Sequence, residues 1–465
     1  MALSAEQIRQ FVNDAIREVS GQTAGTTGEW LCGDANEATS SAKASQKQLS
    51  KMSLEHRGRL IAAMRNAALE NAEYLAELAH NETGYGNVKH KTLKNRLAAA
   101  KTPGIEDLRP EAYSGDDGLT LVECAPFGVI GSITPSTNPT ATVINNSISM
   151  IAAGNSVVYN PHPGAKKSST EAMRILNEAI VSAGGPPALI ATVRQPTLQT
   201  GAAIMGHSDI KLLSVTGGEA VVAVAMKSGK KVIAAGPGNP PVIVDDTAII
   251  TQAARDIVDG ASFDNNVLCV AEKEVFAFDS IAGELMSQMQ HCGAYKASEA
   301  DTDKIVAAVL EQRDGGYAVN RKFVGRDAAY ILRQSGVSYV GTPRLIISEV
   351  DRYHPLVVTE MLMPILPVTR VKNIDEAIAE SLRAEHNYQH SAYIHSTNIK
   401  HMSAAASALN TTIFVKNAPS YSGLGFGGEG FTTLTIATPT GEGLTSAKSF
   451  TRSRRCVLKG DLRIV

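Results

Sequence analysis

Apolar and polar residues recur with a helical period at the start of this chain. The apolar side chains that share one helical stripe within residues 1–20 are Ile8, Phe11, Val12, Ala15, Ile16 and Val19. Ser4 and Gln7, three residues apart, resemble a capping box at the helix start. Residues 21–29, rich in glycine and threonine, are typical of a flexible linker. A helix on such a tether has no local core, so we favour docking on a partner; packing on its own domain is the alternative.

The pattern changes twice further along the chain. Residues 36–79 are rich in alanine and follow a helical period. After about residue 120, apolar segments predict strands at residues 129–133, 157–159, 210–215 and 232–235, with helices at 144–153 and 170–183. A second alternation begins near residue 242 and continues through residues 340, 346–347, 393–394 and 413–415. Alternating strands and helices favour parallel sheets with crossover helices, so we expect an α/β fold with two units that meet near residue 255.

Composition narrows the class of protein. A chain of 465 residues with 43% hydrophobic and 19% charged residues is typical of a soluble globular protein with two or three domains. The net charge of −2 offers no basic surface for nucleic acid or anionic lipid. No apolar run approaches the roughly 18 residues of a membrane helix. The five scattered cysteines have no zinc-site spacing, and no secretory signal is evident, so we expect no metal and a reducing cytoplasm.

Cys269 is the cysteine whose neighbours resemble an active-site loop. A small and amide-rich segment precedes it in the run ASFDNNVLCVAEKEV at residues 261–275, and an apolar strand at residues 270–278 follows. The thiolate is the nucleophilic form of cysteine, and amides or a helix N-terminus can lower the thiol pKa from its free value of about 8.5. A cysteine taken without context is more often a small buried hydrophobic side chain, and it is the rest of the chain that favours the nucleophile here.

Four segments combine polar or glycine-rich turns with neighbouring strands. They are PFGVIGSITPSTNP at residues 126–139, YNPHPGAKKSS at 159–169, LSVTGGE at 213–219 and AAGPGNPP at 234–241. A polar turn after a strand can donate to a developing oxyanion. Backbone N–H groups at a helix start can bind phosphate, although a glycine pair alone is a weak signal because turns also use glycine.

In this order the segments resemble the aldehyde dehydrogenase superfamily over residues 30–465, and its CoA-acylating, propionaldehyde-oxidising branch from bacterial microcompartments most of all. Further matching runs are NNSISM at residues 145–150, MKSGKK at 226–231, GGEGFTT at 427–433 and RSRRC at 452–456. The resemblance implies a Rossmann-like NAD-binding domain at residues 30–255 and an α/β catalytic domain at 256–435. It also implies small oligomerisation strands, one near residues 119–124 and others in the C-terminal segment 436–465.

The resemblance implies that Cys269 attacks the aldehyde carbon. The oxyanion would then be held by the Cys269 backbone N–H and by a donor in the Thr137–Asn138 turn. Gapless alignment places Thr137 at the family's amide position, whereas Asn138 has the suitable chemistry; an Asx-turn before Pro139 is the other interpretation of Asn138. Hydrolytic relatives carry a general-base glutamate at the position of Ala234. Its absence should let an acyl-Cys269 persist until a CoA thiol attacks, unless another residue supplies the base.

Other implied roles concern CoA and the dinucleotide. His390 would accept the CoA thiol proton or orient the acyl intermediate, although a lone histidine is often structural. Glu360 matches the family glutamate that binds nicotinamide-side ribose hydroxyls. Asn160 replaces the family's ribose-binding lysine, which leaves the choice of NAD or NADP open, and Lys166 and Lys167 could serve phosphates. The residues expected around the cofactor are Thr134, Pro135, Asn160, His162, Pro163, Gly217, Gly218, Gly236 and Glu360.

The implied reaction is ping-pong oxidation of a short aldehyde, most simply propionaldehyde, with NAD and CoA as cofactor and co-substrate. Residues 1–20 resemble encapsulation helices, which implies a shell protein as partner and a location in a cytoplasmic bacterial microcompartment. The family also implies a homodimer or homotetramer. Three alternatives stay open: an acetaldehyde-preferring enzyme of ethanolamine breakdown, a hydrolytic dehydrogenase that gives the free acid, and a catalytically silent scaffold subunit.

Overall fold

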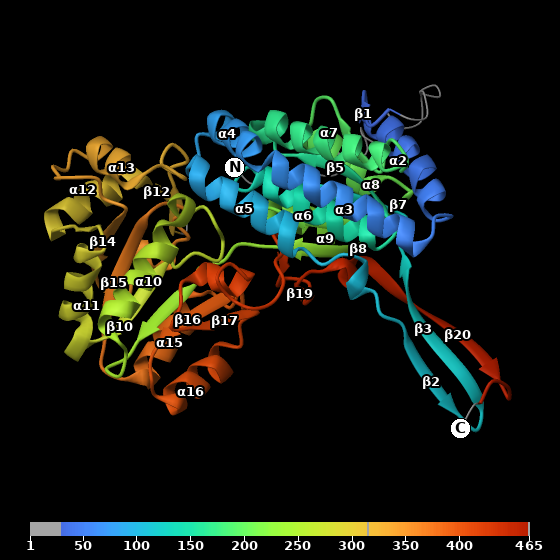
Figure 1. Cartoon of the computed structure of the whole chain (residues 1–465). Coiled ribbons are helices and arrows are strands. Elements are labelled where there is room, and N and C mark those ends of the chain that lie inside the picture. Colours follow the sequence, from blue (N-terminus) through green and yellow to red (C-terminus); the bar gives the residue numbers. More distant parts are fainter. Residues whose placement is uncertain (1–28, 314–315, 464–465) are drawn as a thin grey trace. The chain divides into compact units, whose positions relative to one another are not determined.

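The computed structural model describes residues 29–313 and 316–463. The expected targeting helix, and all of the linker except Glu29, lie outside the described residues. The chain forms two compact units (Figure 1). Unit 1 contains the residues up to Glu82, Thr92–Ala235 and those from Phe431 onward; unit 2 contains Thr83–Lys91 and Gly236–Gly430. A bilayer crossing needs a longer apolar helix than any found in residues 29–313 and 316–463.

Unit 1 is built on a parallel six-stranded sheet in the order β1-β6-β5-β4-β7-β8. Its strands are β1 (Leu31–Cys32), β4 (Val129–Thr134), β5 (Ser156–Pro161), β6 (Ile190–Val193), β7 (Ile210–Thr216) and β8 (Lys231–Ala235). From β4 the chain adds β5 and β6 on one side, then β7 and β8 on the other. The strand order therefore reverses at β4, and ligands of open α/β sheets bind beyond the carboxyl ends of strands at such a point.

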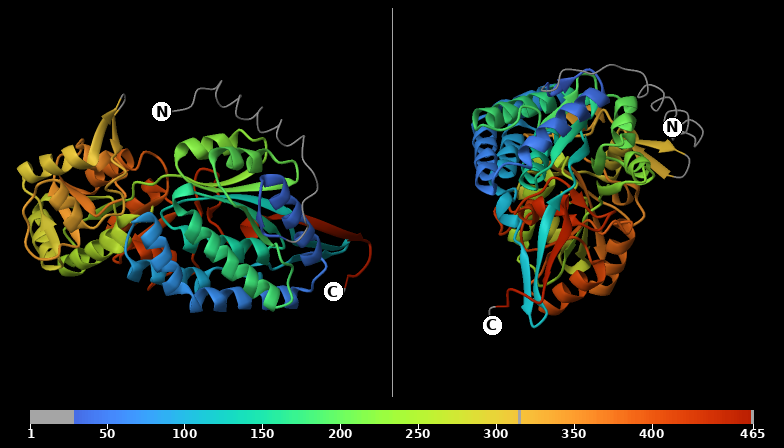
Figure 2. Two further views of the ribbon diagram at one scale, coloured as in Figure 1. Left: turned by 90° about the horizontal axis from the view of Figure 1, so that it is seen from above. Right: turned by 90° about the vertical axis from the view of Figure 1, so that its right-hand side faces the viewer.

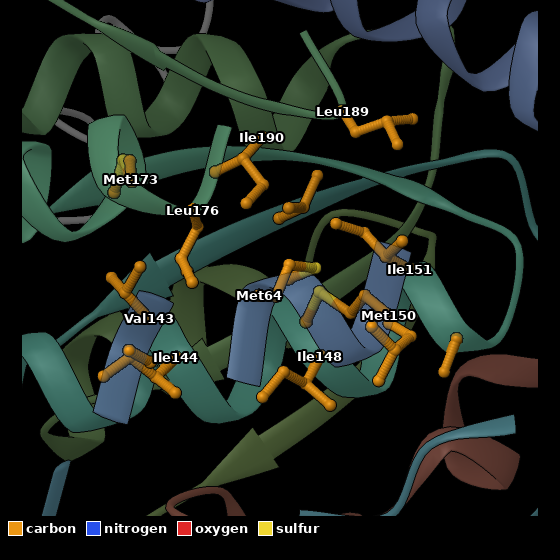
Figure 3. Packing of buried hydrophobic residues seen from close by; sticks show 14 of the residues in the cluster. Met64, Val143, Ile144, Ile148, Met150, Ile151, Met173, Leu176, Leu189 and Ile190 are labelled. Carbon is orange, nitrogen blue, oxygen red and sulfur yellow. The ribbon is translucent and has the colours of Figure 1, made fainter. Parts of the chain in front are cut away.

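Helices cover both faces of this sheet because its strands are apolar on both sides. In β5, Val157 and Tyr159 join one buried cluster while Val158 joins another. Figure 3 shows the first cluster, in which Met64, Ile148 and Leu176 pack together from three helices. The helices of this part of the chain are α2 (Ala35–Leu49), α3 (Leu54–Glu70), α4 (Ala72–Thr83), α5 (Val88–Lys101), α6 (Pro139–Ala152), α7 (Lys166–Ser182), α8 (Leu198–Gly206) and α9 (Glu219–Met226). Short elements are η1 (Ile105–Asp107), η2 (Pro163–Ala165), η5 (Ala447–Phe450), β18 (Ile436–Ala437) and β19 (Gly443–Leu444).

A three-stranded antiparallel sheet extends from unit 1 (Figures 1 and 2). It consists of β2 (Glu111–Gly115), β3 (Gly118–Pro126) and β20 (Thr451–Lys459). The pairing of β20 with β3 runs from Thr451 opposite Pro126 to Lys459 opposite Gly118. The C-terminal segment therefore returns to unit 1, beside the strand expected near residues 119–124. The role of this sheet in oligomerisation stays a prediction.

Unit 2 contains a parallel seven-stranded sheet in the order β11-β14-β15-β10-β9-β16-β17. Its strands are β9 (Pro241–Val244), β10 (Glu274–Phe278), β11 (Ala294–Lys296), β14 (Leu345–Glu349), β15 (Ile365–Val371), β16 (Ser391–His395) and β17 (Ile413–Lys416). β12 (Leu310–Arg313) and β13 (Gly316–Val319) form a separate hairpin. The helices are α10 (Ile250–Ser262), α11 (Asp279–His291), α12 (Glu299–Val309), α13 (Ala328–Gln334), α14 (Pro355–Val358), α15 (Ile374–Ala384) and α16 (Ile399–Leu409), with η3 (Phe263–Asn266) and η4 (Ser420–Leu424). Val275 and Phe276 of β10 join different buried clusters, so this sheet also has two covered faces.

Three expectations about boundaries need correction. The units meet at Ala235 and Gly236, before residue 255, because β9 pairs with β10 and β16 of the second sheet. Val340 belongs to no strand; it is 98% exposed in the loop before β14. The strand after Cys269 begins at Glu274 rather than at residue 270, because residues 270–273 form a turn and a short loop that holds buried charges.

Candidate active site

Four loops of unit 2 carry the candidate chemistry, and each precedes one of four neighbouring strands. Glu360 precedes β15, Cys269 precedes β10, Gly238 precedes β9 and His390 directly precedes β16. These strands are adjacent in the order β15-β10-β9-β16. Because the strands are parallel, their amino ends meet at one edge, so residues up to 152 positions apart in the chain are collected there (390 − 238 = 152).

The loop before Cys269 contains three consecutive residues with left-handed backbone angles. Asp264, Asn265 and Asn266 have φ values of 49°, 54° and 64°. Aspartate and asparagine are the non-glycine residues that tolerate this region best, which explains the sequence Asp-Asn-Asn. Each side chain also holds the loop in place. The bonds are those from the Asn87 N–H to Asp264 (2.9 Å), from Asn265 to the Gly325 carbonyl (2.9 Å) and from Asn266 to the Ala261 carbonyl (2.8 Å).

A buried ion pair secures the same loop. The Lys91 ammonium lies 3.1 Å from Asp264 Oδ2, and both side chains are buried. The Asp264 N–H also donates to Nδ1 of His90 at 2.8 Å. These contacts explain why Thr83–Lys91 belongs to unit 2 although its neighbours in sequence belong to unit 1.

Cys269 is partly exposed at the end of this loop. Burial of its thiol raises the pKa to about 11, and the Glu360 carboxylate adds to the rise. The Lys273 ammonium and the backbone N–H groups of Cys269 and Val270 act in the opposite direction. Desolvation therefore outweighs the backbone donors, which do lower the pKa as the sequence suggested they could.

Glu360 and His390 flank Gly238. The Gly238 N–H donates to the Glu360 carboxylate, whose pKa burial raises to about 7. A Cβ atom on Gly238 would lie 2.9 Å from Cγ of His390, so only glycine allows this close approach. The backbone of Gly238 therefore lies between the Glu360 carboxyl group and the His390 imidazole.

Hydrogen bonds around His390 have a defined direction. The Val270 carbonyl can only accept, so it accepts from the Tyr393 hydroxyl, and Ser391 bonds in turn to Tyr393. The Ser391 hydroxyl then donates to Tyr393 and accepts from Nδ1–H of His390 at 2.8 Å. Nε2 of His390 is left with a free lone pair and has no partner among the described residues. Burial lowers the pKa of His390 to about 4, so its ring is neutral at physiological pH.

Three consecutive charged side chains lie buried beneath the nucleophile loop. Glu272, Lys273 and Glu274 are each 1% exposed. Burial raises the pKa of Glu272 to about 7 and raises that of Glu274 well above its usual range. The sequence does show three adjacent charges at the start of an apolar strand. It does not show that they are buried, because buried charges need partners that periodicity does not reveal. We did not single them out from the sequence.

Unit 1 brings most of the expected cofactor residues to one edge of its sheet. These residues follow the carboxyl ends of β4, β5 and β7: Thr134 and Pro135; Asn160, His162 and Pro163; Gly217 and Gly218. Gly218 caps α9, and no atom lies within 4 Å of a Cβ added there, so the backbone is open to a ligand. The buried Oγ1 of Thr134 has no partner among the described residues. Gly236 is different, because it is the first residue of unit 2.

Asn160 and the start of α7 are already engaged by protein groups. Asn160 donates to the Thr197 carbonyl at 3.2 Å and accepts from the Thr200 hydroxyl at 2.7 Å. The Glu82 carboxylate accepts from the N–H groups of Lys167 and Ser168, both at 2.7 Å. A carboxylate therefore occupies the helix start at which we expected Lys166 and Lys167 to serve phosphates.

Asn138 precedes α6, but its side chain makes no cap bond to that helix. Its Oδ1 accepts from the Lys94 ammonium, and because an ammonium only donates, the amide orientation is defined. Nδ2 of Asn138 is then available as a donor, with a long contact of 3.4 Å to Thr137 Oγ1. The Asn138 side chain therefore does not form the Asx-turn that caps α6, and its oxyanion role stays a prediction. No metal-binding group of three histidine, cysteine or acidic side chains occurs among residues 29–313 and 316–463.

Comparison with known proteins identifies the family. The model of the aldehyde dehydrogenase family matches residues 5–434. The chain belongs to the aldehyde dehydrogenase family. An acetaldehyde dehydrogenase (acetylating) of Bilophila wadsworthia is 51% identical over 448 residues, which cover 93% of this chain and 92% of the relative.

Two solved aldehyde dehydrogenase structures are similar over nearly the whole chain. A propionaldehyde dehydrogenase from the fucose utilisation microcompartment of Clostridium phytofermentans has 49% identity and a TM-score of 0.92, covering 94% of this chain and 100% of that one. A propionaldehyde dehydrogenase of Rhodopseudomonas palustris, with bound CoA and an acylated cysteine, has 47% identity and a TM-score of 0.91, covering 94% and 99%. The expected α/β fold with an aldehyde dehydrogenase architecture is confirmed.

Proposed function

We propose that this enzyme oxidises a short-chain aldehyde to an acyl-CoA through a thioester on Cys269. The observation that carries the proposal is the convergence of Cys269, Glu360, Gly238 and His390 at the amino edge of the unit 2 sheet. This edge offers a nucleophile, a carboxyl group and a neutral imidazole with a free lone pair. The named relatives, which act on acetaldehyde and propionaldehyde, support the same reaction class.

The first half-reaction needs the Cys269 thiolate and an oxyanion site. The thiolate adds to the aldehyde carbon and leaves an alkoxide, which the Cys269 backbone N–H would stabilise. The left-handed loop fixes the sulfur, because three side chains anchor its backbone. Collapse of the alkoxide then expels a hydride and leaves acyl-Cys269.

The residues of unit 1 fit a dinucleotide. The carboxyl ends of β4, β5 and β7 meet beside the reversal of strand order, where the open backbone of Gly218 and the unpartnered Oγ1 of Thr134 are available to a ligand. Bound NAD supplies the acceptor for the hydride. A 2′-phosphate on the ribose would meet no repelling carboxylate from Asn160, His162 or Pro163. NADP is therefore the competing cofactor, and kcat/KM should be compared for NAD and NADP.

The second half-reaction transfers the acyl group to CoA. The CoA sulfur attacks the thioester carbonyl, the Cys269 thiolate leaves, and the proton of the CoA thiol passes to that thiolate. Nε2 of His390 would accept the hydrogen bond of the thiol S–H and so orient the sulfur. The low pKa of His390 disfavours a stable imidazolium, so orientation explains its role better than proton storage.

The decisive experiment follows the reduced cofactor with propionaldehyde in the presence and absence of CoA. We expect one burst per active site without CoA, continuous turnover with CoA, and an acyl adduct on Cys269 in mass spectra of enzyme quenched without CoA. Continuous turnover without CoA would instead assign the hydrolytic reaction. Absence of any adduct, or turnover by Cys269→Ala, would reject the proposal.

Chain length of the aldehyde is the remaining choice within this reaction class. Similarity to the acetylating acetaldehyde dehydrogenase supports acetaldehyde as the substrate, and similarity to the solved propionaldehyde dehydrogenases supports propionaldehyde. One methylene changes discrimination by only about 1–3 kcal/mol, so we propose propionaldehyde on the structural similarity and test it by comparing kcat/KM for the two aldehydes. A higher value for acetaldehyde would reverse the assignment.

We also propose a microcompartment location. It is supported by the amphipathic pattern of residues 1–20 and by the microcompartment origin of a relative with 49% identity. The exposed sheet of β2, β3 and β20 is the surface we propose for a homodimer or homotetramer. Analytical ultracentrifugation of a chain truncated after residue 450 would test this; an unchanged mass would exclude β20 from the interface.

A further inference from the structure

Lys273 is a fully buried lysine four residues after the nucleophile, with 1% of its surface exposed. Its ammonium has three acceptors. They are the Asn266 side-chain oxygen at 2.6 Å, the Leu268 carbonyl at 3.0 Å and the Asn266 carbonyl at 3.3 Å. An ammonium has three N–H donors, so every donor of charged Lys273 is used within the nucleophile loop.

One of these acceptors belongs to the peptide group of the nucleophile. The Leu268 carbonyl and the Cys269 N–H are the two ends of a single planar peptide. In a trans peptide they point in opposite directions, so a cation on the carbonyl side directs the N–H away from itself. That N–H and the Val270 N–H both act to lower the pKa of the Cys269 thiol, so both are donors close to the sulfur. An oxyanion formed at carbon bonded to this sulfur would lie within the same field.

We propose that Lys273 is a positioning residue that aims and polarises the Leu268–Cys269 peptide, and so strengthens the Cys269 N–H as an oxyanion donor. Its ammonium would withdraw electron density through the Leu268 carbonyl, which makes the N–H at the other end of the peptide more acidic. The inference rests on the proposed acylation of Cys269, since only that reaction forms an oxyanion there.

Two physical arguments support polarisation in addition to anchoring. Hydrogen bonds from a charged donor are roughly twice as strong as neutral ones, and linked bonds polarise one another in a region that excludes water. Burial of an ammonium also costs free energy of desolvation, and this lowers the pKa of Lys273. A loop that needed only an anchor could use a neutral donor, whose desolvation costs less free energy. Asn266 shows this, because its neutral amide donates both to the Ala261 carbonyl at the end of α10 and to the Glu272 carbonyl.

Two reactions of the same sulfur separate the alternatives. Alkylation by iodoacetamide needs the thiolate but forms no oxyanion. Acylation by propionaldehyde and NAD needs both. Loss of the Lys273 charge reduces the thiolate fraction and slows both reactions, whereas loss of the polarised N–H slows acylation alone. The ratio of the two rate constants at one pH therefore isolates the effect on the oxyanion donor.

The experiment compares Lys273→Met with Lys273→Gln, which retains a neutral donor, and with Lys304→Met, which removes an exposed lysine paired with Asp301. The burst amplitude gives the concentration of active sites in each variant, and rates are expressed per active site. Unfolded protein therefore does not lower the measured rate constants. Removal of a complete oxyanion donor costs about 100- to 1000-fold. For weakening of one donor we expect acylation to fall about 10-fold more than alkylation in Lys273→Met and less in Lys273→Gln, with no change in Lys304→Met.

The possible results have distinct meanings. Equal slowing of acylation and alkylation in both variants would overturn the inference and leave Lys273 as an anchor or a charge near the thiolate. Unchanged acylation would also overturn it. If Lys273→Met does not fold, the ratio measured for Lys273→Gln decides by the same criterion. Absence of aldehyde-dependent acylation in the unmodified enzyme would reject the proposed function, which is a separate outcome.

Discussion

Replacement of Glu360 by glutamine should make Cys269 more reactive toward an alkylating agent. The Glu360 carboxylate is the largest charge that raises the pKa of the Cys269 thiol, after burial itself. Glutamine keeps the size of the side chain and an oxygen that can accept from the Gly238 N–H. The substitution therefore removes a negative charge and retains the local geometry, so the thiolate becomes easier to form.

The magnitude follows from two pKa values. A thiol with a pKa of about 11 is thiolate in only about one molecule in a hundred at pH 9. Because burial is the larger cause, we take the charge of Glu360 to account for about a tenfold change in this fraction, or ~1.4 kcal/mol. The pKa of Glu360 is about 7, so this carboxyl is largely neutral at about pH 5.5 and charged at about pH 9. The advantage of the variant should appear only as pH rises through 7.

The assay is the rate of iodoacetamide alkylation of Cys269 between about pH 5.5 and pH 9, followed by peptide mass spectrometry. Glu360→Gln and the unmodified enzyme should react equally at the acid end and differ about tenfold at the alkaline end. Glu284→Gln, the same change on the exposed surface of α11, is the control and should match the unmodified enzyme throughout. Parallel pH profiles for Glu360→Gln and the unmodified enzyme, or a slower variant, would refute the electrostatic reasoning.

Three further predictions concern geometry, stability and targeting. Gly238→Ala should displace the His390 ring and slow acyl transfer to CoA about tenfold or more, while the first NADH burst is retained. The control is Gly206→Ala, because a Cβ added at Gly206 meets nothing within 4 Å. Loss of the burst in Gly238→Ala would contradict the argument. Glu272→Gln should raise the melting temperature at pH 8 but not at pH 4.5. Folding raises the pKa of the Glu272 carboxyl from 4.5 to about 7, so this group destabilises the fold increasingly as pH rises through that window, by about 3 kcal/mol when ionised. A pH-independent difference in calorimetry would contradict this prediction. Deletion of residues 1–20 should retain turnover but abolish co-sedimentation with shell protein, and loss of turnover would mean that this segment belongs to the fold.

Much of the fold was readable from local pattern. The alternation of apolar strands and helices predicted the α/β class, and helices such as α6 and α7 lie where periodicity placed them. The errors have physical causes. Val340 has strand propensity but lies in an exposed loop, because propensity is weaker than tertiary context. The unit boundary was misplaced because strand pairing decides to which sheet β9 belongs, and pairing partners are remote in sequence.

The sequence by itself determined the fold class, the family and Cys269 as the candidate nucleophile, because these depend on periodicity and on runs of adjacent residues. Only the tertiary structure decided how Glu360, Gly238 and His390 join Cys269, since four parallel strands bring distant loops to one edge. It also decided the electrostatics. Desolvation raises the pKa of the thiol, and Lys273 is enclosed by the loop it bonds, and both effects depend on which atoms exclude water rather than on neighbours in the chain.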